Sequence, residues 1–218
     1  MGLKLIIANK KYSSWSLRPW LAMKMFGVEF EEVLSPFDMS TASNHFYDFS
    51  PSKKVPVLID GDQSIWDSMA ILEYLAETYP DKNWWPKDQK IRAMARSIAH
   101  EMHGGFGAIR DECPMNFGRV SASIDLSERA KWEFSRLEAM WEYALTQSGG
   151  PFLFADFGIV DAMYAPIVSR VRSYEIKGGA AFQSYLAAIE SLPHYQDWAQ
   201  DGQRETWVVE DVENRSYG

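Results

Sequence analysis

The chain has 218 residues, 46% of them hydrophobic and 24% charged, which is enough to bury a core in one large or two small domains. Acidic residues outnumber basic ones by 30 to 22, and the formal net charge of -8 argues against a nucleic-acid partner or an anionic membrane surface. The single cysteine, Cys113, excludes an internal disulfide and a cysteine-based zinc site. With neither a signal peptide nor an apolar stretch of roughly 20 residues, the chain is expected in the cytoplasm.

The start of the chain alternates strand-like and helical patterns. Residues 3–8 are predicted to form a strand. After a serine-rich turn, residues 16–26 are predicted to form a helix that Ser16 caps and Gly27 closes. Residues 28–34 alternate apolar and acidic side chains, which predicts a strand with one solvated face.

The next patterns complete a first domain. Residues 41–49 have a weaker helical pattern, and residues 55–59 and 63–66 are predicted to form the two strands of a hairpin. Apolar residues recur at helical spacing over residues 69–79, and Pro80 ends that helix. The predicted order of elements is βαβαββα.

The pattern changes after residue 80, where we predict the domain boundary. Residues 1–80 form the first predicted domain, residues 81–88 a polar linker, and residues 89–218 an all-helical domain. Helical patterns occupy residues 91–102, 130–144, 159–171 and 181–189. An acidic tail follows, and from the sequence it either docks or frays.

A cluster of serines at the start of the first predicted helix is the first candidate site. Ser13, Ser14 and Ser16 place hydroxyls and backbone N–H groups where a helix N-terminus stabilises an anion such as a thiolate. Lowering a thiol pKa by ~2 units requires about 2.7 kcal/mol, and one hydrogen bond to a charged group supplies roughly 1.5 to 3 kcal/mol. One serine and the helix dipole therefore suffice. Alternatively, these serines only turn and cap the chain.

Two further dipeptides have the chemistry to bind a peptide. Pro56 at the start of a strand removes a ladder donor and, if cis, directs the backbone groups of Val55 outward. At the next helix start, Ser68 and free N–H groups suit a carboxylate, while Asp67 suits an ammonium group. Each dipeptide alone is equally explained by an edge proline or a plain helix cap. Together with the serines, they match a thiol, a peptide backbone and an α-amino acid, which are the parts of glutathione in order.

Three motifs carry a resemblance to a known family. They are Ser13-Ser14-x-Ser16-x-Arg18, Pro51-x-Lys53-Lys54-Val55-Pro56 and Asp67-Ser68-x-Ala70-Ile71-x-Glu73-Tyr74-Leu75. With the predicted order of elements, they make the chain resemble a cytosolic glutathione transferase over essentially its whole length. The serine motif is similar to that of the zeta class, of bacterial type. The resemblance implies a thioredoxin-like α/β N-terminal domain (βαβαββα), an all-α C-terminal helical bundle and a homodimer.

The resemblance also implies roles for individual residues around glutathione. Ser13 would hydrogen-bond the sulfur, with Ser14 as the second candidate for this catalytic role. The backbone of Val55, before a cis Pro56, would pair with the cysteinyl part. Asp67 and Ser68 would hold the γ-glutamyl end, and Lys53 and Lys54 would meet the glycyl carboxylate.

The first helix of the second domain faces the site in this family. Met102, His103, Phe106 and Arg110 are therefore candidates to line the electrophile pocket, or alternatively form an interhelical core with an exposed Arg110. The pair His100 and His103 lacks a third ligand, so no metal is expected. Arg18 either adds positive potential near the sulfur or is a surface charge.

The chain departs from the family pattern at two positions. Gly158 replaces the hydroxyl residue three positions before Asp161, which removes one bond of a capping box and leaves the other. Trp15 replaces the cysteine that follows the serine pair of the zeta class. Its bulk at the mouth of the site favours an apolar or aromatic electrophile over a small dicarboxylate.

The sequence therefore predicts an enzyme of detoxification, a glutathione transferase that conjugates the glutathione thiolate to an apolar or aromatic electrophile. Glutathione acts as the co-substrate, and no metal takes part. Two alternatives remain open. One is a glutathione-dependent isomerase, such as a maleylacetoacetate isomerase, or a dehalogenase. The other is a non-catalytic protein-interaction module with a transferase-like fold.

Overall fold

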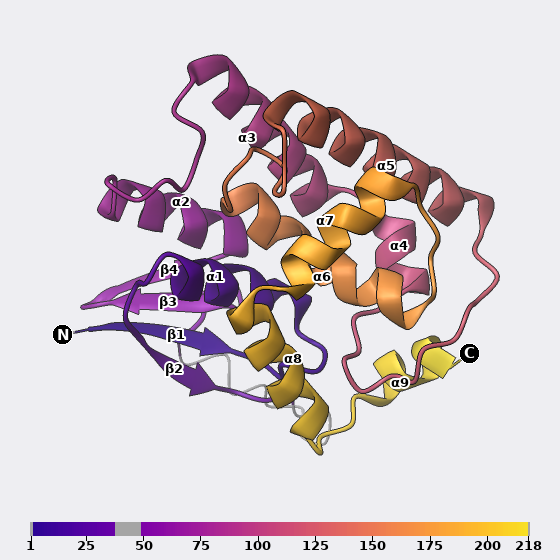
Figure 1. Cartoon of the computed structure of the whole chain (residues 1–218). Coiled ribbons are helices and arrows are strands. Elements are labelled where there is room, and N and C mark those ends of the chain that lie inside the picture. The colour runs from indigo at the N-terminus through magenta and orange to yellow at the C-terminus, as the bar shows by residue number, and fades with distance from the viewer. Residues whose placement is uncertain (1, 38–48, 218) are drawn as a thin grey trace.

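The computed structural model describes residues 2–37 and 49–217, and within them four strands form one mixed sheet (Figure 1). The strands are β1 (Leu3–Ile7), β2 (Phe30–Leu34), β3 (Val57–Asp60) and β4 (Gln63–Trp66), in the spatial order β2-β1-β3-β4. Strand β2 runs parallel to β1, and the other two pairs are antiparallel. Helices α1 (Ser14–Met25) and α2 (Ser68–Thr78) accompany the sheet. Most of the helix predicted at residues 41–49 lies outside the described residues.

The sheet buries both of its faces because side chains alternate along each strand. Leu5 and Leu58, paired across β1 and β3, face the main core together with α1 and α2. The neighbouring pair Ile6 and Val57 faces the opposite side, where both join a smaller apolar cluster with Val55. The alternation therefore fixes the register of β1 against β3.

The remaining described helices follow α2 in the chain. They are α3 (Gln89–Gly104), α4 (Gly107–Glu112), α5 (Glu128–Ser148), α6 (Ile159–Ser173), α7 (Ala180–Glu190), α8 (Pro193–Arg204) and α9 (Glu210–Tyr217). The sheet with its helices and the helical bundle after it match the predicted fold class. None of the described helices combines the length and the apolar character needed to span a bilayer. The boundaries at residues 80 and 88 stay predictions.

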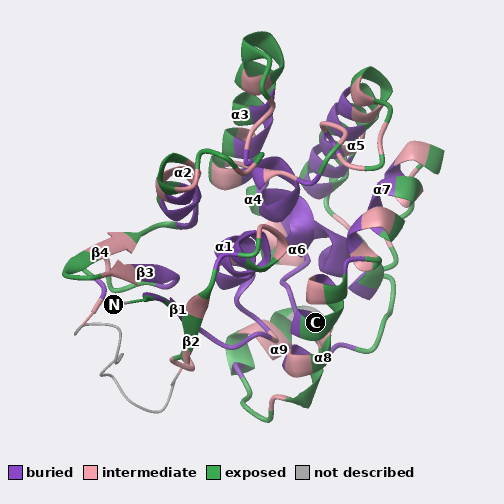
Figure 2. Cartoon of the chain, turned by 60° about the vertical axis from the view of Figure 1, so that its left-hand side comes forward, coloured by how far each residue is buried: buried purple, intermediate pink, exposed green. Residues whose placement is uncertain are grey.

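Helix α6 lies at the centre of the molecule and is buried on nearly every side (Figure 2). It packs against α1 from the sheet region and against α3 of the bundle. Apolar residues lie on all sides of α6, as expected for a core helix, and Asp161 and Arg170 are buried among them. Helix α6 is therefore the element that joins the two parts of the chain.

A buried carboxylate accepts hydrogen bonds at the start of α6. Asp161 Oδ2 accepts the backbone N–H of Gly158 at 2.9 Å, which confirms the predicted half of the capping box. Asp161 Oδ1 also accepts the N–H of Leu153 at 3.1 Å and the hydroxyl of Tyr185 at 3.0 Å. Burial raises the pKa of Asp161 to about 6, against the opposing effect of these hydrogen bonds.

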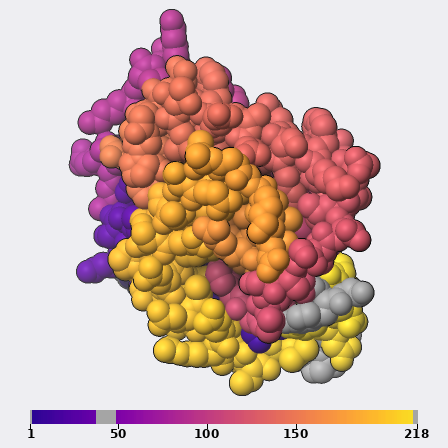
Figure 3. Space-filling model, turned by 45° about the vertical axis from the view of Figure 1, so that its right-hand side comes forward, coloured from indigo at the N-terminus to yellow at the C-terminus, as the bar shows by residue number. Residues whose placement is uncertain are grey.

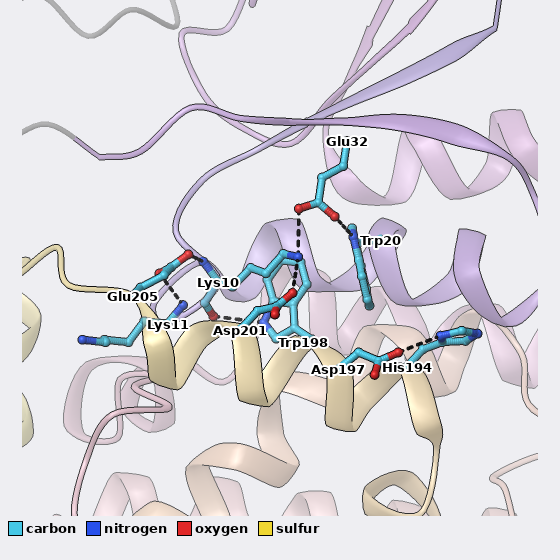
Figure 4. A network of polar contacts seen from close by, with 9 residues as sticks. All are labelled: Lys10, Lys11, Trp20, Glu32, His194, Asp197, Trp198, Asp201 and Glu205. Atoms are coloured by element: carbon cyan, nitrogen blue, oxygen red, sulfur yellow. Dashed lines mark hydrogen bonds and ion pairs between the residues drawn. The ribbon is translucent and has the colours of Figure 1, made fainter.

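The C-terminal helices close over the start of the chain (Figure 4). Lys10 Nζ lies 2.8 Å from both Glu32 and Asp201, and its ammonium group packs against the rings of Trp20 and Trp198. The indole N–H of Trp198 donates to the carbonyl of Lys10 at 3.0 Å. Burial alone would lower the pKa of Lys10, but the two carboxylates raise it overall.

The tail docks rather than fraying. The carboxylate of Glu205 accepts the N–H groups of Lys10 and Lys11 at 2.7 and 3.0 Å. The hydroxyl of Tyr12 donates to Glu213 of α9. Figure 3 shows the C-terminal residues, in yellow, along the lower edge of the molecule and continuous with the orange bundle.

Candidate functional site

The start of α1 differs from the prediction by two residues. Helix α1 begins at Ser14 and is capped by Ser13, so the prediction of Ser16 as the cap was wrong. Ser13 Oγ accepts the N–H of Ser16 at 3.3 Å and donates its proton to Ser16 Oγ at 2.8 Å. Ser16 Oγ also accepts the N–H of Ala8 at 3.2 Å, which ties the first turn of the helix to the end of β1. Hydrogen bonds within this turn thus engage both the oxygen and the proton of the Ser13 hydroxyl.

Ser14 has a different partner. Its Oγ accepts a hydrogen bond from Arg170 Nη2 of α6 at 3.3 Å, across 156 positions of sequence. Arg170 is buried, and its Nη1 donates to the carbonyls of Cys113 and Arg110. Burial, and then repulsion from the Arg110 guanidinium, lower the pKa of Arg170 to about 10, so it is still a cation at neutral pH.

Trp15 stands between two guanidinium groups. The central carbon of Arg18 lies 4.2 Å from the indole centroid and that of Arg110 lies 4.8 Å from it. The ring of His103 meets the indole edge-on at 5.3 Å. Trp15 therefore brings together α1, α3 and α4 in one site.

Arg18 is fully buried, which excludes the alternative of a surface charge. Its three guanidinium nitrogens have no hydrogen-bond partner among the described residues. Burial, and then the charges of Arg110 and Arg170, lower the pKa of Arg18 well below its usual value. Buried guanidinium groups normally have partners, so this group is a sign of a ligand site.

Some of the residues predicted to line the electrophile pocket are buried in the core, and others are accessible. Met102 and Phe106 are buried in the core, which agrees with the alternative prediction that they form an interhelical core. Arg110 is half-buried, contrary to the alternative of an exposed side chain, and donates to the carbonyls of Gly105 and Met102. Of the four residues predicted on this element, His103 and Arg110 are the ones that contact Trp15.

Asp67 and Ser68 lie at the start of α2. Asp67 Oδ1 accepts the N–H groups of Met69 and Ala70 at 2.9 and 3.3 Å, and this residue has a positive φ of 77°. Its other oxygen lies 3.2 Å from His103 Nε2. Burial lowers the pKa of His103, although Asp67 opposes that effect. The contacts run from Asp67 through His103 to Trp15, so the starts of α2 and α1 share one site.

Ser68 and the Val55–Pro56 peptide bond are two more predicted features of the site. The hydroxyl of Ser68 is buried and has no hydrogen-bond partner among the residues that the structure describes. The Val55–Pro56 peptide bond is cis, as the resemblance implied. Val55 packs with Ala8, at the end of β1. Lys53 and Lys54, just before it, are exposed.

Metal and cysteine chemistry have no support here. Residues 2–37 and 49–217 contain no group of three or more His, Cys, Asp or Glu side chains that could hold a metal ion. His100 is exposed, and its Nδ1 lies 2.8 Å from the carbonyl of Arg96, as in an ordinary polar helix. Burial raises the pKa of Cys113 to about 12, which keeps it a thiol at neutral pH.

A hollow of the described surface lies away from these residues. A cavity of about 740 Å³ lies between the segment after α2, the end of α5 and the loop before α6. Its lining includes Trp84, Met94, Tyr143 and Phe154, and none of the predicted site residues. Volume alone therefore does not identify the candidate site, whereas the unpaired buried cations do.

Sequence reasoning missed Arg170. It lies in an otherwise apolar helix, and a charged residue inside such a pattern was the available signal. Its partner Ser14 is 156 positions away, and single-sequence patterns do not pair residues at that separation.

Comparisons with known proteins show which family the chain resembles. The family model for the N-terminal domain of glutathione S-transferase matches residues 12–78. A probable maleylacetoacetate isomerase of Caenorhabditis elegans is 38% identical over 86 residues, which is 39% of each chain. One from Vibrio cholerae is 22% identical over 210 residues, covering 92% of this chain and 98% of its own. The crystal structure of a Burkholderia glutathione transferase homologue with bound glutathione shares the fold, with a TM-score of 0.72, 20% identity, and coverage of 94% of this chain and 100% of its own.

Proposed function

We propose that the chain is a member of the glutathione S-transferase family, that it binds glutathione along the starts of α1 and α2, and that it activates the glutathione thiol for attack on an electrophile. The observation that carries the proposal is the buried, positively charged start of α1, where Arg18 and Arg170 lie without a carboxylate partner among the described ion pairs. A thiolate is an anion that such a site stabilises.

The proposal assigns a part of glutathione to each binding residue. The backbone of Val55 pairs with the cysteinyl part of glutathione, beside the end of β1. The buried, unpartnered hydroxyl of Ser68 receives the γ-glutamyl carboxylate, and Asp67 attracts the ammonium group of that end of glutathione. Lys53 and Lys54 are near enough in sequence to meet the glycyl carboxylate.

The chemistry needs a thiolate and a positioned electrophile. The thiol releases its proton to solvent, and the sulfur lone pair then forms a bond to an electrophilic carbon as the leaving group departs with its electron pair. A serine hydroxyl at the start of α1 donates a hydrogen bond to the sulfur. The indole of Trp15, edged by His103, offers an aromatic face for the second substrate, which favours an aromatic or apolar electrophile.

A second candidate function has an observation of its own. Arg110 and the buried Arg18 flank Trp15, and cations at this place suit an electrophile that carries a carboxylate. The worm and Vibrio relatives are named probable maleylacetoacetate isomerases, and glutathione-dependent isomerisation of a carboxylate substrate by this chain would fit that charge. This observation opposes the expectation drawn from the bulk of Trp15 alone.

Calorimetry with glutathione is the experiment that tests the function. We expect the wild type to bind glutathione and to show thiolate absorbance near neutral pH, and no binding would favour a non-catalytic interaction module. Comparing turnover of an aryl halide with turnover of maleylacetoacetate then separates the two enzyme candidates. A chain that acts faster on the dicarboxylate would overturn the apolar-electrophile proposal.

A homodimer and a cytoplasmic location are also proposals. Both come from the resemblance and the composition, and the second fits a chain with a single cysteine. Sedimentation of the purified protein tests the dimer directly.

A further inference from the structure

We propose that Ser14, not Ser13, donates the hydrogen bond to the glutathione sulfur, and that Arg170 of α6 is the positioning residue for its hydroxyl. This inference rests on the proposed function and assigns a separate role to each of the two serines and to Arg170 within the same site. It reverses the order in which the sequence ranked the two serines.

Ser13 has no proton to offer a ligand in this arrangement. Its hydroxyl donates to Ser16 Oγ at 2.8 Å, while its oxygen accepts the N–H of Ser16 at 3.3 Å. A hydroxyl has one proton, so donation to sulfur would break the bond to Ser16. Ser13 therefore acts as the cap of α1.

Ser14 has a proton available. Its oxygen accepts a bond from Arg170 Nη2 at 3.3 Å, and none of the hydrogen bonds found in the described residues uses the Ser14 hydroxyl as a donor. An oxygen that accepts from a cation becomes a stronger donor through its own O–H. Ser14 is also the first residue of α1, where the helix dipole favours an anion.

Arg170 is held firmly enough to position a hydroxyl. Its side chain is buried, and its Nη1 is fixed by the carbonyls of Cys113 and Arg110. No ion pair of the described residues includes Arg170, so its charge lacks a counter-ion. A thiolate beside Ser14 would supply that negative charge, and burial strengthens such an attraction.

Other charged groups around the site set the pH at which the thiol ionises. Three of these groups are cationic: Arg18 of α1, Arg110 of α4 and Arg215 of α9. The other titratable groups are Asp67 before α2, His103 of α3, Cys113 after α4, Tyr164 of α6 and Tyr174 just after α6. Arg18, the buried charged group among them, is cationic, and it favours the thiolate independently of either serine. The test must therefore separate a hydroxyl effect from a general charge effect.

The experiment measures the pKa of the bound glutathione thiol by its ultraviolet absorbance, after calorimetry has shown that each variant binds glutathione. Ser14→Ala is expected to raise the thiol pKa by about one unit, which lowers the thiolate fraction at neutral pH by up to about tenfold. Ser14→Thr keeps the hydroxyl and should restore most of the thiolate. Ser13→Ala should change the thiolate fraction less than about threefold, below the effect of one charged hydrogen bond.

Arg170 is tested through Ser14 with a double-variant cycle. Arg170→Gln should raise the thiol pKa, and adding Ser14→Ala to it should have a smaller effect than Ser14→Ala alone, because the two residues act as a unit. Additive effects would show that Arg170 acts only as a distant charge and would overturn its positioning role. If Arg170→Gln does not fold, Arg170→Lys provides the measurement, and a thiol pKa equal to that of the wild type would contradict the need for the guanidinium geometry.

The outcomes separate this inference from the proposed function. If the wild type binds no glutathione, both fail. If it binds and ionises glutathione but Ser13→Ala abolishes the thiolate while Ser14→Ala does not, only the present inference is overturned.

Discussion

Helices α1 and α6 both begin in buried surroundings, but the buried polar groups near their starts differ in whether they have hydrogen-bond partners within the described chain. At the start of α6, the carboxylate of Asp161 receives three hydrogen bonds, from Gly158, Leu153 and Tyr185. At the start of α1, Ser13 supplies the cap, while the neighbouring guanidinium of Arg18 has unpartnered nitrogens among the described residues.

The difference separates a structural site from a ligand site. Where a buried polar group has all its partners within the chain, removing it costs stability. Where buried donors have no partner, the missing acceptor is expected from outside the chain. We therefore expect changes at α6 to affect unfolding and changes at α1 to affect glutathione chemistry, and each prediction below tests that division.

The largest expected effect is at Asp161. Asp161→Ala leaves three buried donors unpaired, and each such group costs about 1 to 3 kcal/mol, so the free energy of unfolding should fall by about 3 kcal/mol or more. Urea denaturation measures this change. Ser127→Ala, which removes the cap of α5, is the matched control with a cost of about 1 kcal/mol. Equal losses in the two variants would contradict the special role of Asp161.

The next largest effect is expected in the pH dependence of the free energy of unfolding. Burial raises the pKa of Asp161 to about 6 in the folded chain, above its value in the unfolded chain, so the folded state binds more protons between these values. Stability from this group is complete at acidic pH and is lost as the pH rises through about 6. Relative to Asp161→Asn, the wild type should lose up to about 3 kcal/mol between acidic and neutral pH, measured by urea denaturation at each pH. A constant difference across this range would show that the carboxyl keeps its ordinary pKa.

Ser13→Ala should have a moderate effect on stability. It removes the cap of α1 and its bond to Ser16, which costs about 1 kcal/mol of unfolding free energy. Thermal denaturation, compared with Ser14→Ala, measures it. Ser14 lacks a capping bond, so a larger loss of stability in Ser14→Ala than in Ser13→Ala would reverse the roles assigned to the two serines.

The smallest effect is expected at Gly158. A hydroxyl residue there would complete the capping box, but a Cβ at this position would lie 3.1 Å from the carbonyl oxygen of Trp84. The close contact offsets the few tenths of a kcal/mol that the cap adds, so Gly158→Ser should change stability by less than about 0.5 kcal/mol. Chemical denaturation would reject this explanation of the glycine if the variant gained more than about 1 kcal/mol.

The sequence was sufficient for the features that depend on local patterns. The alternation in β1 and β2, the apolar face of α3, and Asp67 as a cap of α2 each involve residues a few positions apart. The half capping box of Asp161 was readable for the same reason. The helix α1 was also predicted, but three nearby serines left its first residue ambiguous, and Ser16 was the wrong choice because its hydroxyl bonds back to Ala8.

Features that depend on distant partners were not readable. Helices α4, α8 and α9 were missed because α4 has only six residues and the other two are mostly polar. The bond between Arg170 and Ser14 joins elements that only the tertiary fold brings together. Two residues expected around the electrophile lie in the core instead: Met102 packs there from α3, and Phe106 from the turn before α4.

The contacts of Lys10 have a consequence for biosynthesis. Its ammonium group and the neighbouring Trp20 are covered by Trp198 and Asp201 of α8, which are made near the end of translation. A nascent or prematurely terminated chain that lacks α8 therefore presents an uncovered indole on its N-terminal half, a surface that chaperones and proteases recognise. Completion of α8 therefore covers the segment between β1 and α1 together with the indole of Trp20.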